Sequence, residues 1–544
     1  MHHKTPLALA AGCLVLAGSA AQAFTFETDN LKGAFDSTVT AGLGIRVQGP
    51  ACGLLVEGGT RSGAPAACLA PTSGLGDQGN LNYGRGDPFT AYLKGTHELS
   101  LKLPAGVSML ARASWMRDVA ATRTTGLLSS NAPADLSGGL TPEARESLRF
   151  QARLLDLWAS KTFDIGGSQV RARLGNQVIN WGESLFLGGG INVTNAMDFQ
   201  RLSLPGTQIK EGLLPAPMLS VATGLGNGIN FEGYWQFNWN KSFLPPAGSY
   251  FSTSEALGRG NSRYGSTEFD ARNGGQWGLA LRWQPANTAL NLGAYAINYH
   301  DKTPQLRLNQ TSFASEFVYL EDRRVYGVSA NLPLGDWAVG AELSYRPRDA
   351  VAYSPLQGCT TRDGRCWVDS KRWQLNLTGI YSFTPSNARP FLEALGADGG
   401  TFLVELAAVH FPGLQDVDGG DPLAAGYGGW GLETDPTAAL QIGGTRRSSG
   451  VAMNLSINYD GTLIDGWQVV PEIYWFQALG GRTPTLLQPF TRGNRSLNLQ
   501  VAFIRNPALW QITLNYARFM GGRSPLDNAL RDRDFVGLAV SRNF

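Results

Sequence analysis

The sequence predicts an all-β protein, namely an antiparallel transmembrane β-barrel of about 18 strands, with 16 as the alternative count. Charged residues make up 16% of the chain and 68 of its 544 residues are glycine, whereas typical soluble domains have about 25% charged residues and about 7% glycine. Many segments alternate apolar and polar residues over the length of one strand. The chain also lacks the apolar run of ~20 residues that a membrane helix needs.

The N-terminus has the pattern of a secretory signal peptide. Residues 1–23 begin with a positive stretch around Lys4, continue with an apolar run over 7–17 and end on the A-x-A sequence 21–23. Cys13, which follows Ala-Ala-Gly, leaves a lipoprotein signal as the alternative. We therefore expect residues 24–544 to form one exported domain.

The other four cysteines form two pairs that are close in sequence. Cys52 and Cys68 are sixteen residues apart, and Cys359 and Cys366 are seven apart. In an exported chain this spacing predicts two loop-closing disulfides. A bond that closes a loop of roughly fifteen residues is worth about 3 kcal/mol. No metal site or cofactor is expected, because there is no C-x-x-C motif and the histidines of the mature chain are far apart: His97, His300 and His410.

Charge excludes one class of partner. The formal net charge is +2, and residues 1–23 contribute Lys4 and no acid, so the mature chain carries +1. It has no basic tail and no block of like charges, which makes nucleic acid an unsuitable partner.

Period-two alternation is clearest in four segments: 229–239, 373–379, 497–501 and 510–516. It places apolar residues on one face and Asn, Gln, Ser and Thr on the other. The last strand, 535–544, ends on Phe544, as outer-membrane barrels commonly do. Aromatic residues near the ends of the apolar faces predict interfacial girdles: Trp239, Trp277, Trp283, Trp373, Trp510 and Tyr516.

Turn lengths predict the orientation of the barrel. Short turns are expected at 104–106, 285–287, 333–335, 460–461 and 506–507, and bacterial barrels keep short turns in the periplasm. Both cysteine pairs then lie in outside loops, 48–87 and 348–370.

Strand parity requires one further strand in the middle of the chain. Segments 168–181 and 228–240 should both run outward, so a strand must return between them, and residues 217–224 are the candidate. This strand brings the count to about 18. The stretches 151–163 and 400–410 alternate poorly, which leaves 16 as the alternative.

Residues 182–216 lack a clean strand pattern, and we expect them to fold inward as a lumenal plug. An ordinary outside loop is the alternative, but the segment contains apolar residues, such as Leu187 and Ile191, that need a surface to pack against. A barrel of this width leaves a lumen that wall side chains alone do not fill, and irregular backbone is tolerated at membrane depth when protein surrounds it. The expected constriction residues are Asn180, Trp181, Gly182, Glu183, Ser184, Phe186, Gly188, Gly189, Gly190, Asp198, Arg201, Pro205 and Gly206.

The glycine run of this segment does not fit a nucleotide site or an esterase site. Gly188–Gly190 lacks the Lys-Ser/Thr of a P-loop and the G-x-G-x-x-G spacing, and Phe186 stands where a G-x-S-x-G elbow needs glycine. We expect these glycines to let the chain leave the wall and turn into the lumen, with Asn180, Trp181 and Glu183 as anchors. No histidine has a catalytic partner nearby in sequence, so we do not expect an enzyme.

Parity also predicts which charged side chains face the lumen. They carry both signs, so no simple ion preference follows, and most are expected to form ion pairs that stabilise the barrel and plug. The predicted lumen-facing residues are Lys94, Glu98, Arg112, Arg171, Arg173, Glu232, Arg282, Glu342, Arg346 and Glu405.

The stretch "NWGESLFLGGGIN" with the following "LPGTQ", then "NFEGYWQFNW" and "GSYFS", resembles a proteobacterial family known as domain of unknown function 1302. The resemblance extends over 24–544. It implies an exported barrel in the Gram-negative outer membrane, surrounded by its lipids. It also implies a periplasmic or lipoprotein partner, an inner-membrane pump of RND type, and transport of hydrophobic compounds.

These observations favour an outer-membrane channel for hydrophobic or amphipathic small molecules, of lipid, steroid or aromatic type, gated by an internal plug. A general or substrate-selective porin is one alternative. A non-conducting barrel that docks a periplasmic or RND-type system is the other.

Overall fold

The computed structural model describes residues 24–51, 54, 78–128, 132–133, 136, 138–352, 363–414, 444–487, 489–505, 509–522 and 528–544. The expected signal peptide, residues 1–23, lies outside this part of the chain, as do Cys52, Cys68 and Cys359. The signal peptide and the two disulfides therefore remain predictions.

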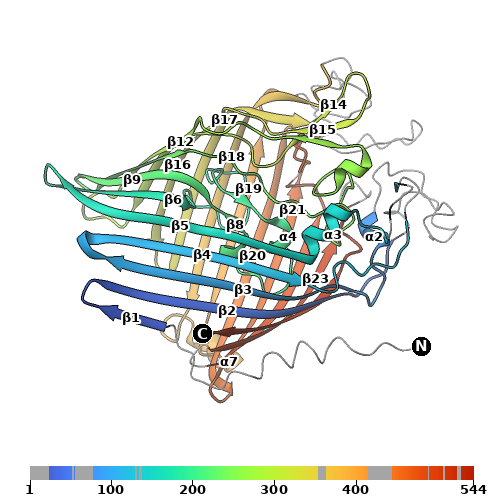
Figure 1. Cartoon of the computed structure of the whole chain (residues 1–544). Coiled ribbons are helices and arrows are strands. Elements are labelled where there is room, and N and C mark those ends of the chain that lie inside the picture. Colours follow the sequence, from blue (N-terminus) through green and yellow to red (C-terminus); the bar gives the residue numbers. More distant parts are fainter. Residues whose placement is uncertain are drawn as a thin grey trace.

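Eighteen strands of the described chain form one closed antiparallel barrel (Figure 1). The last strand closes the ring beside the first, with Leu538 opposite Leu43. The predicted count of 18 is confirmed. In ring order the strands are β2 (Leu31–Arg46), β3 (Pro88–Leu103), β4 (Val107–Asp118), β5 (Phe150–Ile165), β6 (Ser168–Gln177), β9 (Ala216–Gly226), β10 (Ile229–Gln236), β12 (Gln276–Trp283), β13 (Asn291–Tyr299), β16 (Arg323–Leu334), β17 (Trp337–Ala352), β18 (Trp367–Phe383), β19 (Gly399–His410), β20 (Arg447–Ile464), β21 (Trp467–Gly480), β22 (Arg495–Arg505), β23 (Trp510–Met520) and β24 (Phe535–Asn543).

The returning strand predicted at 217–224 is β9, and the two poorly alternating stretches are β5 and β19. Short elements lie outside the ring. The strands among them are β1 (Phe24–Thr28), which pairs with the start of β2, β7 (Ala196–Met197), β8 (Leu213–Leu214), β11 (Thr267–Phe269), β14 (Gln305–Leu308) and β15 (Ser315–Val318). The helices are α2 (Gln78–Leu81), η3 (Pro104–Gly106), α3 (Pro142–Arg149), α4 (Phe199–Leu202), α5 (Ile209–Gly212), η4 (Asn261–Tyr264) and α7 (Arg389–Leu395).

Side chains alternate between the lumen and the outside. In β17, Glu342 and Arg346 are buried on the inner face, whereas Leu343 is exposed on the outer face, as a period of two requires. The same outward exposure recurs around the ring, at Leu93, Leu157, Leu174, Leu219, Leu279, Val328, Leu375, Leu406, Ile473, Leu499, Leu514 and Leu538.

This outer belt of apolar side chains places the barrel in a membrane. Water would surround a belt of that size at a high cost in free energy, whereas a closed barrel satisfies its backbone hydrogen bonds in lipid. The protein is therefore an outer-membrane β-barrel. None of the helices in the described part of the chain is long and apolar enough to cross a membrane.

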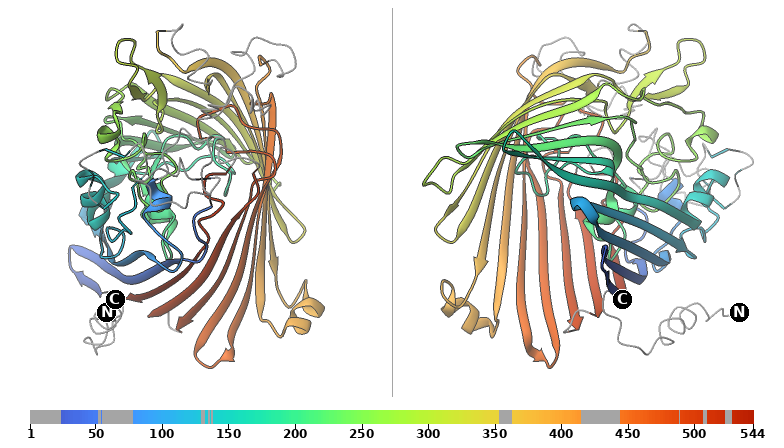
Figure 2. Two further views of the ribbon diagram at one scale, coloured as in Figure 1. Left: turned by 90° about the vertical axis from the view of Figure 1, so that its right-hand side faces the viewer. Right: turned by 60° about the vertical axis from the view of Figure 1, so that its left-hand side comes forward.

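Short turns gather at the end of the barrel where the C-terminus lies, and long connections gather at the other (Figures 1 and 2). The turns at 104–106 and 285–287 lie at the expected end, and so does the turn predicted at 333–335, which follows the end of β16 at Leu334. The turn predicted at 506–507 lies outside the described residues. We refer to this end as periplasmic, because bacterial barrels keep their short turns there.

Three predicted boundaries are wrong. Strand β6 ends at Gln177, because Trp181 leaves the wall and packs into the lumen. Strand β10 ends at Gln236, so Trp239 lies beyond it, with its indole N–H donating to the Asp301 carbonyl. Asp460-Gly461 is no turn, since β20 continues through an irregular register to a turn at 465–466.

Candidate functional site

Residues 178–215 connect β6 to β9 through the interior of the barrel. Their polar contacts reach inward-facing side chains of β17, β18 and β19 in one half of the ring, and of β3, β4 and β5 in another. A segment that touches the inner faces of well-separated strands must cross the lumen. We call residues 182–191 the first arm and residues 197–212 the second arm.

The first arm is bound by Glu405 of β19, which is fully buried. One carboxylate oxygen accepts the backbone N–H groups of Leu185, Phe186 and Leu187 at 3.1, 2.5 and 2.9 Å. The other oxygen accepts the Ser184 hydroxyl at 2.8 Å. Bonds to a charged acceptor contribute about 1.5–3 kcal/mol each, so this carboxylate is a strong anchor.

Gly182 and Gly190 lie against a second wall carboxylate, that of Glu342 in β17. Its two oxygens accept the backbone N–H groups of Glu183 at 2.7 Å and Ile191 at 3.1 Å. A Cβ on Gly190 would collide with this carboxylate, and Gly189 has a φ of 96°, so both positions favour glycine. Gly188 has open space at its Cα and no positive φ, and nothing in the structure requires glycine there.

Carbonyl groups of the same arm accept from the wall. Arg346 donates to the carbonyls of Gly189 at 2.6 Å and Gly190 at 3.1 Å. Gln374 donates to Gly188 at 3.1 Å, and Asn376 to Leu187 at 3.0 Å. Gln374 and Asn376 were not singled out from the sequence, although they share the inward parity of their strand.

Trp181 fixes the point where the chain leaves the wall. Its side chain is 2% exposed and packs among apolar residues of β10, β12 and β13. Its indole N–H donates to Glu232 at 2.9 Å, and Arg282 lies 3.9 Å from the same carboxylate. Asn180 is exposed and accepts from Asn192 at 2.9 Å.

Two features hold the segment beside Trp181. Asn331 donates to the Glu183 carboxylate at 2.9 Å. Ile191 is fully buried against Gly327 of β16, where a Cβ would collide with the Ile191 side chain. Gly182, next to Trp181, has a φ of 96° and no room for a Cβ beside Glu342. The wall therefore carries small residues where the arm approaches it.

The second arm is bound by charged groups of the opposite wall. Asp198 caps α4 by accepting the Arg201 backbone N–H at 2.8 Å, and it pairs with Arg153 of β5. The buried Arg201 side chain donates to Ser114 of β4 at 2.8 Å. Arg153 and Ser114 carried no signal in the sequence that tied them to this segment.

Strand β3 holds the Pro205-Gly206 turn. Tyr92 donates its hydroxyl hydrogen to the Pro205 carbonyl, and Lys94 donates to the Gly206 carbonyl at 3.0 Å. Lys94 also forms a buried ion pair with Glu211 at 2.9 Å. Glu211 was missed from the sequence because the segment has no strand parity to place its side chains.

The remaining predicted lumen residues do not bind the segment. Arg112 pairs with Glu98 at 2.7 Å within the wall. Arg173 stacks over Trp158 at 4.1 Å, and Arg171 is exposed inside the lumen. These charges therefore stabilise the wall or face water.

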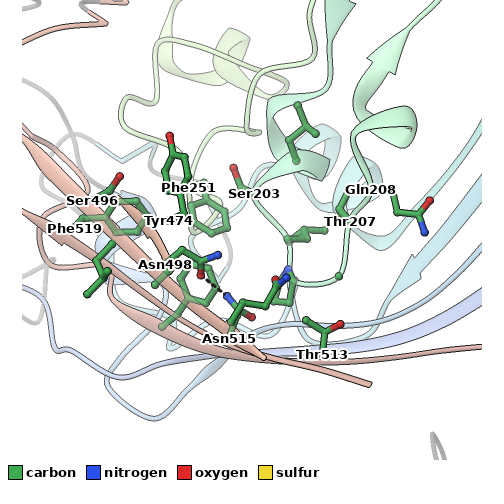
Figure 3. Close-up of a pocket in the computed structure, with 18 of the residues that line it drawn as sticks. Ser203, Thr207, Gln208, Phe251, Tyr474, Ser496, Asn498, Thr513, Asn515 and Phe519 are labelled. Carbon is green, nitrogen blue, oxygen red and sulfur yellow. Dashed lines mark hydrogen bonds between the residues drawn. The ribbon is translucent and has the colours of Figure 1, made fainter. Parts of the chain in front are cut away.

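A cavity of about 420 Å³ remains between the second arm and strands β21–β24. We call this cavity the passage. Its wall side carries a column of neutral amides and hydroxyls, in which Asn515 donates to Asn498 at 3.2 Å (Figure 3). Residues 202–208 form the opposite side. The aromatic residues that line it are Phe251, Tyr474, Phe519 and Phe535.

Two apolar side chains of the first arm stay exposed inside the barrel. Leu185 is 43% exposed and Phe186 37% exposed. The Phe186 ring meets that of Tyr474 edge-on at 5.5 Å, and Tyr474 lines the passage. Apolar surface of the arm thus lies next to the passage.

The three histidines of the described residues are engaged by neighbouring groups. His97 faces outward, where it contacts the Ser37 hydroxyl and accepts from the Trp115 indole. His300 accepts the Asp322 backbone N–H, and His410 lies 3.3 Å from the Arg446 carbonyl.

A family model described as "Protein of unknown function (DUF1302)" matches residues 4–544. No curated protein matches the chain in sequence. Similar solved structures include Acinetobacter baumannii OccAB1, at 9% identity and a TM-score of 0.45 over 96% of this chain and 98% of that chain. Pseudomonas aeruginosa OpdK with vanillate follows at 12% identity and 0.42, over 94% and 98%. Salmonella typhi OmpF in complex with daunomycin is similar at 8% and 0.36, over 96% and 100%.

Proposed function

The chain belongs to the DUF1302 family, and from this premise we propose that it is an outer-membrane channel for hydrophobic or amphipathic small molecules of lipid, steroid or aromatic type. Residues 178–215 act as its internal plug, and the molecules move along the passage beside it.

The lining of the passage is the observation that supports this proposal. Among the described residues that line it, none is charged, and neutral amides and hydroxyls stand beside aromatic and aliphatic side chains. An uncharged molecule with an apolar face meets matching chemistry there, whereas an ion would leave water without a compensating charge.

Several charged side chains of the lumen contact the two arms rather than the passage. Glu342, Glu405, Arg346 and Lys94 bind the two arms. A porin for charged solutes would instead present such groups to the solute. The mixed-sign set predicted from parity therefore supports the plug rather than ion selectivity.

Leu185 and Phe186 give a second reason for an apolar substrate. Their exposed side chains lie inside a barrel that also contains many polar groups, and covering apolar surface is favourable by roughly 25 cal/mol per Å². An apolar molecule beside Tyr474 would supply that cover. Because such a molecule is poorly soluble in the periplasm, the proposal includes a periplasmic or lipoprotein partner and an RND-type pump.

Uptake by proteoliposomes tests the function. Labelled fatty acids or sterols should enter faster than into empty vesicles, and the variant with Leu185→Ser and Phe186→Ser should lose several-fold of that rate. Arg171→Ser is the matched control, since Arg171 is an exposed, inward-facing residue of β6. Large steady ion conductance without apolar uptake would instead indicate a porin. No permeation by a correctly folded barrel would indicate a docking role.

A further inference from the structure

Aromatic side chains form a contiguous group on the outer face at the periplasmic end. Trp337 of β17 meets Tyr381 of β18 at 5.1 Å and Phe402 of β19 at 6.2 Å between ring centroids. These residues have the outward parity of Leu343 and Leu375. They form a section of the interfacial girdle that membrane barrels carry.

This girdle continues onto helix α7, in the turn 384–398 between β18 and β19. Tyr381 meets Phe383 at 5.0 Å, and Phe383 in turn meets Phe391 of α7 at 5.0 Å. In both views of Figure 2 the helix projects at the end of the barrel where the short turns lie.

The helix is held firmly against the wall. Leu392 is 2% exposed, and Gly396 ends the helix in the left-handed region at a φ of 60°. The outward-facing Tyr459 of β20 donates to the Leu395 carbonyl at 3.3 Å, and Asp398 accepts the Asp460 backbone N–H at 2.7 Å. The exposed side chains of α7 therefore point in a fixed direction.

Two of those exposed side chains are large and apolar. Phe391 is 42% exposed and Leu395 44% exposed, and residues four apart lie on one face of a helix. Arg389 and Glu393 form an exposed ion pair at 2.7 Å, and helical periodicity puts them on the opposite face. The helix is thus amphipathic, with one polar and one apolar side.

We propose that α7 is an interfacial helix that binds phospholipid of the periplasmic leaflet, with Phe391 and Leu395 placed at the boundary between headgroups and acyl chains. Lipid is the occupant because the exposed face is continuous, ring against ring, with the lipid-facing belt of the barrel. Interfacial helices bury an apolar face in this way and keep charged groups toward water. This contact would fix how deeply strands β17–β20 sit in the membrane.

Site-specific photocrosslinking tests the inference in the intact chain. Phe391→p-benzoylphenylalanine and Leu395→p-benzoylphenylalanine should yield adducts with the mass of a phospholipid after irradiation of cells. Leu375 on the belt is the positive control, and Glu393 on the polar face is the negative control. Heat-modifiable migration checks that each variant folds.

The inference is overturned if position 391 gives a protein adduct, or if it gives no lipid adduct while position 375 does. Equal lipid adducts at 391 and 393 would contradict it as well. The outcome is independent of transport, because α7 lies outside the lumen.

Discussion

Replacing Glu405 by glutamine should release the first arm of the plug from the wall. The carboxylate accepts three backbone N–H groups and the Ser184 hydroxyl. A glutamine whose oxygen faces the three N–H groups keeps these bonds only as bonds to a neutral acceptor. Its NH₂ group replaces the oxygen that accepts from Ser184 and Asn376. The strands keep their own ladder hydrogen bonds, and the barrel itself should stay folded.

The magnitude follows from the weakened bonds. A hydrogen bond to a charged group contributes about 1.5–3 kcal/mol and a neutral one about 0.5–1.5 kcal/mol, so weakening the three N–H bonds costs about 3 kcal/mol in total. Since 1.4 kcal/mol corresponds to a factor of ten, about 3 kcal/mol shifts the bound–released equilibrium of the arm roughly a hundredfold.

Amide hydrogen exchange measures this shift directly. Protection of the peptide that contains Leu185, Phe186 and Leu187 should fall about a hundredfold, while peptides of β17–β19 keep theirs. Single-channel conductance in planar bilayers should rise, because a released arm widens the lumen. Glu98→Gln is the control, since Glu98 pairs with Arg112 in the wall and touches neither arm. Unchanged protection and unchanged conductance in the Glu405→Gln variant would refute the anchoring role.

Two further changes probe the wall and the outside loops. Gly327→Val puts side-chain atoms where Ile191 now packs, so the first arm should be displaced and conductance should rise in planar bilayers. Gly224→Val in β9 is the control, because a Cβ there meets only an ordinary contact and the φ is not positive. Equal conductance of the wild type and Gly327→Val would contradict the packing. In the outside connection 300–322, burial raises the pKa of Asp301 to about 7, from an ordinary value of about 4. The folded loop therefore binds a proton more tightly than the unfolded loop, and its stability falls as the pH rises from about 4 to about 7. Protease cleavage in this loop should be faster at pH 8 than at pH 5, and Asp301→Asn should reduce that difference. If the difference stays the same in this variant, titratable groups other than Asp301 cause it.

Much of the fold was predictable because it depends on local alternation. Period two placed Glu342, Arg346 and Glu405 on the inner face of their strands, and the missing return strand was found by parity at 217–224, where β9 lies. Strand ends were less predictable. Trp181 has the residue type of a girdle aromatic, yet it leaves the wall for the interior because its ring finds an apolar cluster there.

The contacts of residues 178–215 were not predictable in the same way. Parity could mark Lys94 and Glu405 as inward-facing but could not pair Lys94 with Glu211, because 178–215 has no repeating geometry from which a side-chain direction follows. The surroundings of the triple glycine were also not predictable from the sequence. The sequence excluded a phosphate loop, but only the folded barrel brings the Glu342 carboxylate to Gly190 and leaves Gly188 in open space.

The sequence by itself determined the class of fold, a count of about 18 strands with 16 as the alternative, and the inner face of the charged wall residues that it named, because these depend on neighbours along the chain. Tertiary structure alone decided which wall charges hold the two arms, and hence that a neutral, aromatic-lined passage remains beside β21–β24. The physical reason is that these contacts join residues from 45 positions apart, as with Arg153 and Asp198, to 221 positions apart, as with Ser184 and Glu405. Their closeness depends on how the whole ring closes.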